Sequence, residues 1–199
     1  MKENEDLQVE RLGNQLEGYS IGLCVTGGIA AIESPKVARQ LRRYGANVKV
    51  YTTPEALKFV GEDSLIWGSG NDVVKGLTGR AEHICLEDLV LVAPATMNTC
   101  NKVLTGIADN VVTCLIASAL GKKVPVYMAP TMHISLYNNP FFQENLQKAE
   151  KYGVKIIEPR FGENKAKIPK TSFLVGEVIK YFQKQNEQKA SLGDLENGS

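Results

Sequence analysis

Short apolar runs alternate along the chain with longer stretches in which apolar and polar positions mix. The apolar runs occupy residues 21–25, 48–51, 89–93, 124–128 and 154–157. Two of these runs contain a single lysine, Lys49 or Lys155, and the run at 89–93 is unbroken. Mostly apolar runs of this length are typical of strands that are buried on both faces, as in a parallel sheet. The mixed stretches predict helices over residues 32–44, 54–60, 99–105, 109–120, 140–152 and 173–182. This alternation predicts right-handed crossovers and one α/β domain, a three-layer α/β/α Rossmann-like (flavodoxin-like) parallel sheet.

The run at 89–93 is the most informative of these, because a polar segment follows it directly. Pro94 cannot donate a hydrogen bond to a strand ladder, so the strand is expected to end there. The hydroxyl and amide groups of Thr96, Asn98 and Thr99 follow, where a helix should begin with a side-chain cap. Open α/β sheets bind ligands at the carboxyl ends of their strands. The pattern therefore indicates a nucleotide or phosphate site, with an ordinary capped strand–turn–helix as the alternative.

Two more predicted strands end in small or hydroxyl-bearing residues. The first is followed by Thr26-Gly27-Gly28-Ile29-Ala30 and the second by Thr52-Thr53. The glycines permit a close backbone approach, and free N–H groups in such a turn can face an anion. The turn is not a GxGxxG motif, and a glycine pair after a first strand is common. Three neighbouring strand ends of this kind are stronger evidence for a site than any one alone.

The chain has only two histidines, and each has two interpretations. His83 precedes the central strand and can act as a general base near neutral pH, or it can be an ordinary loop histidine. His133 can bind a carboxylate or phosphate, or it can cap the helix that follows it.

Composition narrows the class of protein. The 199 residues suit one domain at 19–182, between a polar N-terminal extension (1–18) and a polar C-terminal tail (183–199). A net charge of +1 argues against nucleic-acid binding through a broad basic field. Neither a secretory signal nor a membrane-spanning run is expected, so the protein is predicted to be cytoplasmic. The four cysteines lack CxxC spacing, which favours reduced, buried thiols and no metal site.

Several of these segments together resemble the homo-oligomeric flavin-containing cysteine decarboxylases. Residues 26–31 are similar to the phosphate loop of that family, and Pro94-Ala95-Thr96-Met97-Asn98-Thr99 looks like its PASANT motif. His83 falls where the family has its catalytic histidine. Residues 130–137 are similar to the substrate-recognition motif PxMNxxMW. The resemblance extends from about residue 19 to residue 182.

The resemblance implies an FMN-dependent carboxy-lyase, most closely one that converts 4'-phosphopantothenoylcysteine to 4'-phosphopantetheine in coenzyme A biosynthesis. It implies a homotrimer, or a multiple of one, with flavin between protomers, a small thiol carboxylate as substrate and His83 as the base. The implied FMN-binding residues are Thr26, Gly27, Gly28, Ile29, Ala30, Thr53, Phe59, Pro94, Ala95, Thr96, Asn98 and Thr99. The implied substrate-binding residues are Met132, His133 and Tyr137.

The sequence departs from the family pattern at three points. His133 replaces the asparagine that holds the substrate carboxylate, and Tyr137 replaces tryptophan. Residues 161–168, which match a C-terminal flap, lack the cysteine that donates a late proton in bacterial and eukaryotic members. Lys165 or Lys167 is therefore a candidate proton donor. These forms look more like the archaeal branch, whose members are usually fused to a synthetase domain.

Three alternatives remain open from the sequence. The chain could catalyse oxidative decarboxylation of a peptidyl cysteine, which the absent flap cysteine favours. It could be a prenylated-FMN synthase on the same fold, although that class normally lacks the histidine at position 83. It could also be a non-catalytic flavin-binding subunit that regulates a partner.

Overall fold

The middle layer of the protein is a six-stranded, all-parallel sheet. The computed structural model describes residues 8–196. The strand order is β3-β2-β1-β4-β5-β7, which is the 3-2-1-4-5-6 order of Rossmann folds rather than the flavodoxin-like order 2-1-3-4-5. The strands are β1 (Ser20–Val25), β2 (Asn47–Thr52), β3 (Val73–Val74), β4 (Leu89–Ala95), β5 (Val126–Pro130) and β7 (Val154–Ile156).

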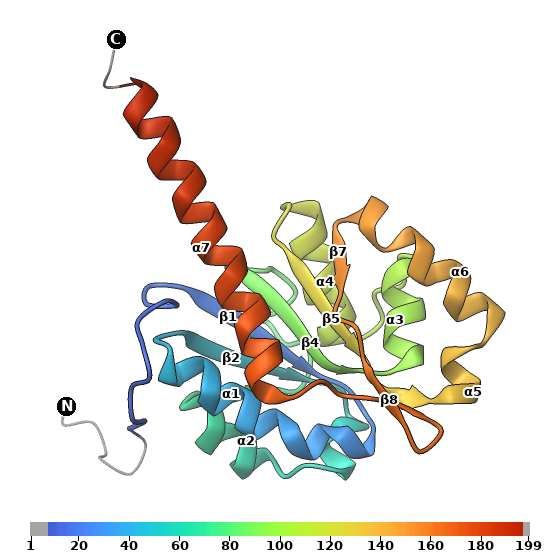
Figure 1. Cartoon of the computed structure of the whole chain (residues 1–199). Coiled ribbons are helices and arrows are strands. Elements are labelled where there is room, and N and C mark those ends of the chain that lie inside the picture. The colour runs from blue at the N-terminus through green and yellow to red at the C-terminus, as the bar shows by residue number, and fades with distance from the viewer. Residues whose placement is uncertain (1–7, 197–199) are drawn as a thin grey trace.

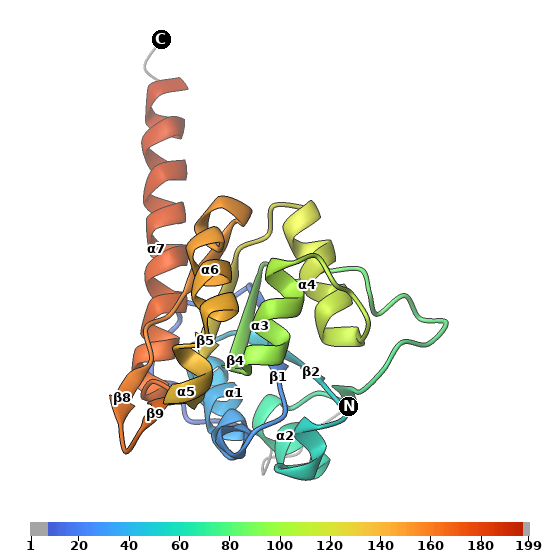
Figure 2. The same ribbon diagram turned by 90° about the vertical axis from the view of Figure 1, so that its right-hand side faces the viewer.

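Helices cover both faces of this sheet (Figures 1 and 2). One face carries α1 (Ser34–Arg43), α2 (Glu62–Ser69) and α7 (Thr171–Glu196), and the other carries α3 (Met97–Leu104), α4 (Val111–Gly121) and α6 (Pro140–Lys148). Each face has its own core cluster of buried residues. The predicted three-layer α/β/α, Rossmann-like architecture is therefore confirmed.

The central strand β4 is buried along its whole length and lies between β1 and β5. The prediction that it ends at Pro94 was wrong by one residue. The ladder shifts register between Val92 and Ala95, so Ala95 pairs with Pro130, and the Ala95 carbonyl accepts a hydrogen bond from Thr131 N (2.9 Å). The strand can continue past Pro94 because this hydrogen bond uses the Ala95 carbonyl and needs no N–H from the proline.

Several helix boundaries differ from the pattern-based expectation. The segment 54–60 forms only a short 3-10 helix, η3 (Ala56–Lys58), and the regular helix α2 lies beyond it. Helix α4 is capped by Asn110 and not by Asp109, because the Asn110 side chain accepts hydrogen bonds from Val112 N and Thr113 N. Short flanking elements are η2 (Ile29–Glu33), α5 (Ile134–Tyr137) and η4 (Glu150–Tyr152).

The two ends of the chain are more ordered than their polar composition suggests. In the N-terminal extension, Leu16 is buried and its N–H donates to the Tyr44 carbonyl (2.8 Å); residues 1–7 of the extension lie outside the described residues. The closing helix was predicted over 173–182 but runs as α7 to Glu196. Its first half packs Leu174, Val178 and Phe182 on the core, and its second half projects beyond the body of the protein (Figure 1).

A second, small antiparallel sheet stands at the carboxyl edge of the main sheet. It consists of β6 (Met132–His133), β9 (Lys165–Lys167) and β8 (Arg160–Gly162), in that order. Most of residues 161–168, the segment that matches the flap of the family, belongs to the β8–β9 hairpin. Its turn residues Glu163 and Asn164 both have positive φ (52° and 55°), as a two-residue hairpin turn requires.

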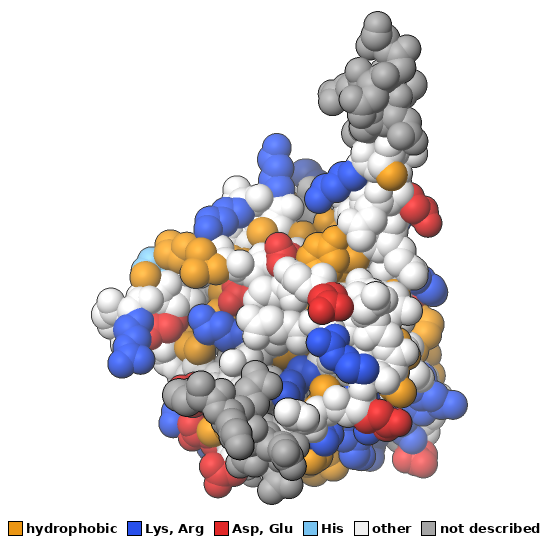
Figure 3. All heavy atoms as spheres, turned by 90° about the vertical axis from the view of Figure 1, so that its left-hand side faces the viewer, with side chains coloured by type: hydrophobic (Ala, Val, Ile, Leu, Met, Phe, Trp, Pro, Cys, Tyr) orange, Lys and Arg blue, Asp and Glu red, His pale blue; other side chains and the backbone are white. Residues whose placement is uncertain are grey.

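The surface and the thiols match the composition. On the face shown in Figure 3, lysine and arginine side chains are interspersed with acidic ones, and no broad single-sign field is visible. All four cysteines are free, and Cys24, Cys85 and Cys100 are buried. Within residues 8–196 no helix combines the length and apolar character needed to cross a membrane.

Candidate functional site

A cavity of about 810 Å³ lies at the carboxyl edge of the main sheet. Its walls come from the turn after β1, the segment that joins β4 to α3, the small sheet and the start of α7. The lining includes Gly27, Gly28, Ile29, Ala30, Pro94, Thr96, Asn98, Met132, His133, Lys165 and Lys167. Eleven of the residues predicted from sequence therefore line one cavity, although they come from four separate segments.

Buried Thr26 joins the first two of these segments. Its Oγ1 donates to the Pro94 carbonyl (2.8 Å) and accepts from Thr96 N (3.0 Å). These two bonds fix the ends of β1 and β4 next to each other. Thr26 thus stands behind the cavity wall and does not line it.

The two glycines of the turn have different surroundings. A Cβ on Gly27 would lie 2.3 Å from Glu55 Cβ, so the turn packs tightly against the segment after β2. A Cβ on Gly28 would meet only Thr96 Cγ2, at 3.8 Å. No hydrogen bond from the backbone N–H of either glycine occurs within residues 8–196. The Gly28 side of the turn is therefore open and carries free donors.

The segment after β4 caps a helix, as the sequence predicted. Thr96 is the N-cap of α3, and its Oγ1 accepts from Thr99 N (3.4 Å) and donates to Thr99 Oγ1 (3.2 Å). Thr99 is buried by this arrangement and does not line the cavity. Asn98 is exposed and lines it.

The small sheet forms the opposite wall. His133 pairs with Lys165 across the β6–β9 ladder. The Nδ1 atom of His133 accepts from Ser135 N (3.2 Å), so the imidazole caps α5 and Nε2 remains available to a ligand. Lys167 forms an ion pair with Glu163 (2.8 Å).

Several predicted ligand-binding residues do not line the cavity. Ala95 is buried in β4, and Phe59 is an exposed residue after η3. Thr53 is buried at the end of β2, and its Oγ1 has no hydrogen-bond partner. The ring of Tyr137 contacts Phe142 and Phe161 edge-on (5.5 and 5.2 Å between centroids), so it packs the hairpin against α6.

His83 lies away from the cavity of its own chain. It is an exposed residue in the segment between β3 and β4, which projects on the opposite side of the body from the β8–β9 hairpin (Figure 2). The base of this segment is anchored, because Cys85 N donates to Ser118 Oγ (2.9 Å) and Lys122 Nζ donates to the Cys85 carbonyl (2.7 Å). The structure of one chain therefore separates the imidazole from the cavity.

Cysteine chemistry at the cavity is disfavoured by burial. Cys100 lies behind the Thr96 segment, and desolvation raises the pKa of its thiol to about 12. A neutral, buried thiol is not a reactive thiolate at physiological pH.

The sequence pattern missed part of the cavity wall. Arg160 and Lys170 flank the hairpin and line the cavity, and Glu33 and Leu136 also contribute. The four cations between residues 160 and 170 were a usable signal, but the sequence does not show which of them face the cavity.

Comparison with known proteins is consistent with this architecture. Residues 9–183 match the sequence model of the family described as Flavoprotein. The chain belongs to the Flavoprotein family. The flavoprotein is 40% identical over 173 residues to the "Coenzyme A biosynthesis bifunctional protein CoaBC" of Thermococcus kodakarensis, which covers 83% of this chain and 43% of that protein.

Two further similarities come from a shorter relative and a solved structure. The flavoprotein is 36% identical to the "Probable phosphopantothenoylcysteine decarboxylase" of Streptococcus mutans, over 69% of this chain and 81% of that one. It resembles the crystal structure of TvaF, an FMN-dependent cysteine decarboxylase from thioviridamide biosynthesis, with a TM-score of 0.64 and 30% identity over 71% of this chain and 91% of that one. The flavoprotein spans less than half the length of the bifunctional relative.

Proposed function

We propose that this protein binds FMN in the cavity at the carboxyl edge of its sheet. Two features of the cavity suit a flavin mononucleotide. The open side of Gly28 and the free N–H groups of the turn suit a phosphate, and a volume of about 810 Å³ is within the range of cofactor pockets. The Oγ1 atom of Thr53, at the end of β2, is buried without a hydrogen-bond partner and is a further polar group at the carboxyl edge of the sheet.

We further propose that the protein decarboxylates a cysteine-derived carboxylate, with 4'-phosphopantothenoylcysteine as the substrate. The observation that carries this proposal is the joining of the Gly27–Gly28 turn, the Thr96–Asn98 segment and Met132–His133 around one cavity. The relatives in Thermococcus kodakarensis and Streptococcus mutans support it through the names they carry. Bound FMN would accept two electrons from the cysteine moiety and return them after CO2 is lost, so the overall reaction is redox-neutral.

The residues of the chain have separable roles in this proposal. His133 Nε2 donates a hydrogen bond to the substrate carboxylate, because Nδ1 is already engaged with Ser135 N. Lys165 donates the late proton, since it lines the cavity without an ion pair within residues 8–196, whereas Lys167 is bound to Glu163. His83 takes a proton from the substrate as general base, and a neighbouring copy of the chain supplies it, since His83 does not line the cavity of its own chain.

A flavin spectrum followed by a product assay tests the proposal. The purified protein should absorb visible light as an oxidised flavin and convert 4'-phosphopantothenoylcysteine to 4'-phosphopantetheine. His83→Asn should keep the flavin and lower turnover by about two to four powers of ten, the range for loss of a general base. A colourless protein that does not take up added FMN would contradict the cofactor assignment. Full activity of His83→Asn would contradict the role of the imidazole.

A second reaction is favoured by one feature of the chain. Residues 161–168 lack a cysteine, and the 30% identical TvaF is named a cysteine decarboxylase of thioviridamide biosynthesis. Oxidative decarboxylation of a peptidyl cysteine would stop at an ene-thiol and leave the flavin reduced. Mass spectrometry separates the two reactions, because the ene-thiol has two hydrogens fewer than the saturated thiol.

A further inference from the structure

Two cations at the base of the β8–β9 hairpin face the cavity without a counter-charge. Arg160 and Lys170 both line it and both are exposed. Neither forms an ion pair with a carboxylate within residues 8–196. Of the other charged residues of the wall, Lys167 is paired with Glu163 (2.8 Å) and Glu33 with Lys36 (3.1 Å), whereas Lys165 in the hairpin also forms no ion pair within residues 8–196.

Hydrogen bonds tie Arg160 to the segment that leads to Lys170. The Nε and Nη2 atoms of Arg160 both donate to the Ile168 carbonyl (3.1 Å each), two residues before Lys170. These two hydrogen bonds fix the plane of the Arg160 guanidinium and leave its remaining N–H groups free to bind a ligand. Lys170 directly precedes α7, and Thr171 at the start of that helix also lines the cavity. The positive end of a 26-residue helix therefore adds to the same region.

We propose that Arg160 and Lys170 form a binding site for a phosphomonoester dianion, the terminal phosphate of the substrate. An arginine fixed in its plane and a lysine on the wall of the same cavity are a favourable pair for a doubly charged phosphate. The flavin phosphate is assigned to a different wall, the turn at Gly27 and Gly28. The site would make the protein select phosphorylated substrates over unphosphorylated or peptidyl ones. The identity of the ligand rests on the proposed function, whereas binding of the dianion does not.

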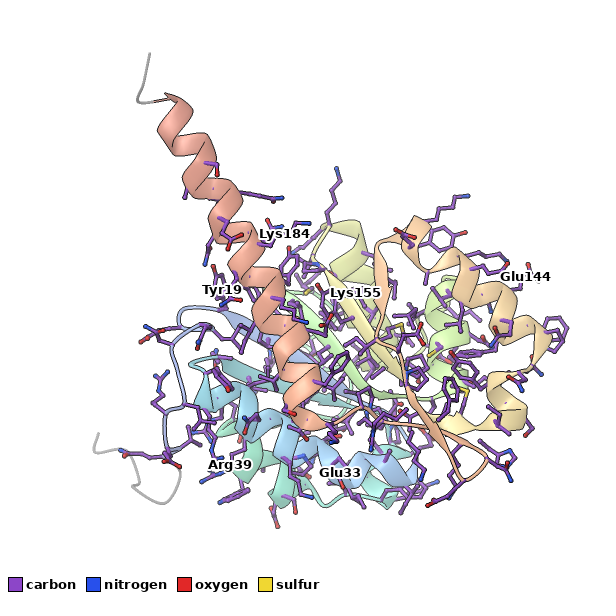
Figure 4. All side chains as sticks on the ribbon, viewed as in Figure 1. Tyr19, Glu33, Arg39, Glu144, Lys155 and Lys184 are labelled. Carbon is purple, nitrogen blue, oxygen red and sulfur yellow. The ribbon has the colours of Figure 1, made fainter. Side chains whose placement is uncertain are left out.

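The test uses the flavin-loaded protein and two ligands that differ only in the phosphate, 4'-phosphopantothenate and pantothenate. Calorimetry should show that the unaltered protein binds the phosphorylated ligand at least about tenfold more tightly, as expected for charge-assisted hydrogen bonds. Arg160→Gln combined with Lys170→Gln should remove this preference and leave the affinity for pantothenate unchanged. Lys184→Gln is the matched control, because that lysine lies far along α7 from the cavity (Figure 4).

Three outcomes would overturn the site. The double variant could keep the preference, it could lose affinity for both ligands equally, or it could lose affinity for FMN, which would assign the cations to the flavin phosphate. This binding test does not depend on the proposed reaction, because neither 4'-phosphopantothenate nor pantothenate contains a cysteine that could be decarboxylated. A protein that prefers 4'-phosphopantothenate but leaves 4'-phosphopantothenoylcysteine unchanged would keep the anion site and lose the proposed reaction.

Discussion

At the scale of single residues, the geometry of the cavity depends on a buried hydroxyl and two adjacent glycines. Thr26 ties β1 to β4 with two hydrogen bonds, and its burial means that losing them would leave the Pro94 carbonyl and the Thr96 N–H unsatisfied. Gly27 and Gly28 follow it, one against the protein and one toward the cavity. The three residues are contiguous in sequence but have different physical tasks.

Alanine substitutions should separate these two glycines. Gly27→Ala should lower the free energy of unfolding by about 1–3 kcal/mol, because the new Cβ overlaps Glu55. Gly28→Ala should leave stability nearly unchanged, because its φ of −179° suits any residue and no atom is close. Its methyl group would instead weaken FMN binding by about tenfold, by blocking close approach to the turn.

Denaturant unfolding without flavin and fluorescence titration with FMN measure these two effects separately. Equal loss of stability in both variants would show that the open side of Gly28 is not open in solution. Unchanged FMN affinity in Gly28→Ala would remove the phosphate from this turn.

At the scale of elements, α7 is attached to the sheet by more than its apolar face. Glu177 accepts hydrogen bonds from Lys155 on β7 and from Lys180 on the next turn of its own helix (2.8 Å each). These bonds lower the pKa of the Glu177 carboxyl below its ordinary value of 4.5. A carboxyl with a depressed pKa in the folded state stabilises the fold above pH 4.5, and this stabilisation is lost as the pH falls below that value.

Glu177→Gln should therefore destabilise the protein at pH 7 by about 1 kcal/mol. The difference from the unaltered protein should shrink as the pH falls from about 5 to about 3, because protonation then removes the same charge from Glu177. Glu187→Gln, on the exposed part of the same helix, is the control. Urea unfolding at a series of pH values measures this, and a difference that stays constant with pH would contradict the role of the ion pairs.

At the scale of the whole molecule, the proposed base His83 does not line the cavity of its own chain. The segment between β3 and β4, which contains His83, projects on the side of the body opposite the β8–β9 hairpin (Figure 2). Exposed apolar side chains occur near both regions, among them Leu86 (77% exposed) beside His83 and Ile29 (69%) at the glycine turn. We propose that these surfaces meet between copies in a trimer, so that each cavity receives the imidazole of a neighbour.

Mixing two inactive variants tests this arrangement. His83→Asn removes the base, and Gly28→Asp places a carboxylate where the flavin phosphate should bind. In randomly mixed trimers about a quarter of the sites should combine an intact cavity with an intact neighbouring imidazole, so activity should return. Light scattering should give the mass of a trimer for each protein. No recovery after subunits have been shown to exchange would place His83 and the cavity within one chain.

The sequence alone determined the layers of the fold and most of the cavity's wall on the main sheet. Mostly apolar runs predict buried parallel strands because such strands are covered on both faces, and this was correct for five of the six strands of the main sheet. The carboxyl ends of parallel strands share one edge, so the residues at 26–30 and 94–98 could be placed together without coordinates. Helix starts were predicted less well: the helix predicted from residue 109 begins at Val111, because the Asn110 side chain accepts hydrogen bonds from Val112 N and Thr113 N.

Only the tertiary structure decided which side chains face the cavity and what closes it. The β8–β9 hairpin pairs with β6 across some thirty residues of sequence, and its residues give no periodic signal that predicts such a contact. Its pairing places Arg160 at the cavity wall and Phe161 against the ring of Tyr137. The separation of His83 from the cavity is likewise a long-range property. Local patterns specify elements because they reflect burial along one segment, whereas a site depends on distances between segments that no local pattern encodes.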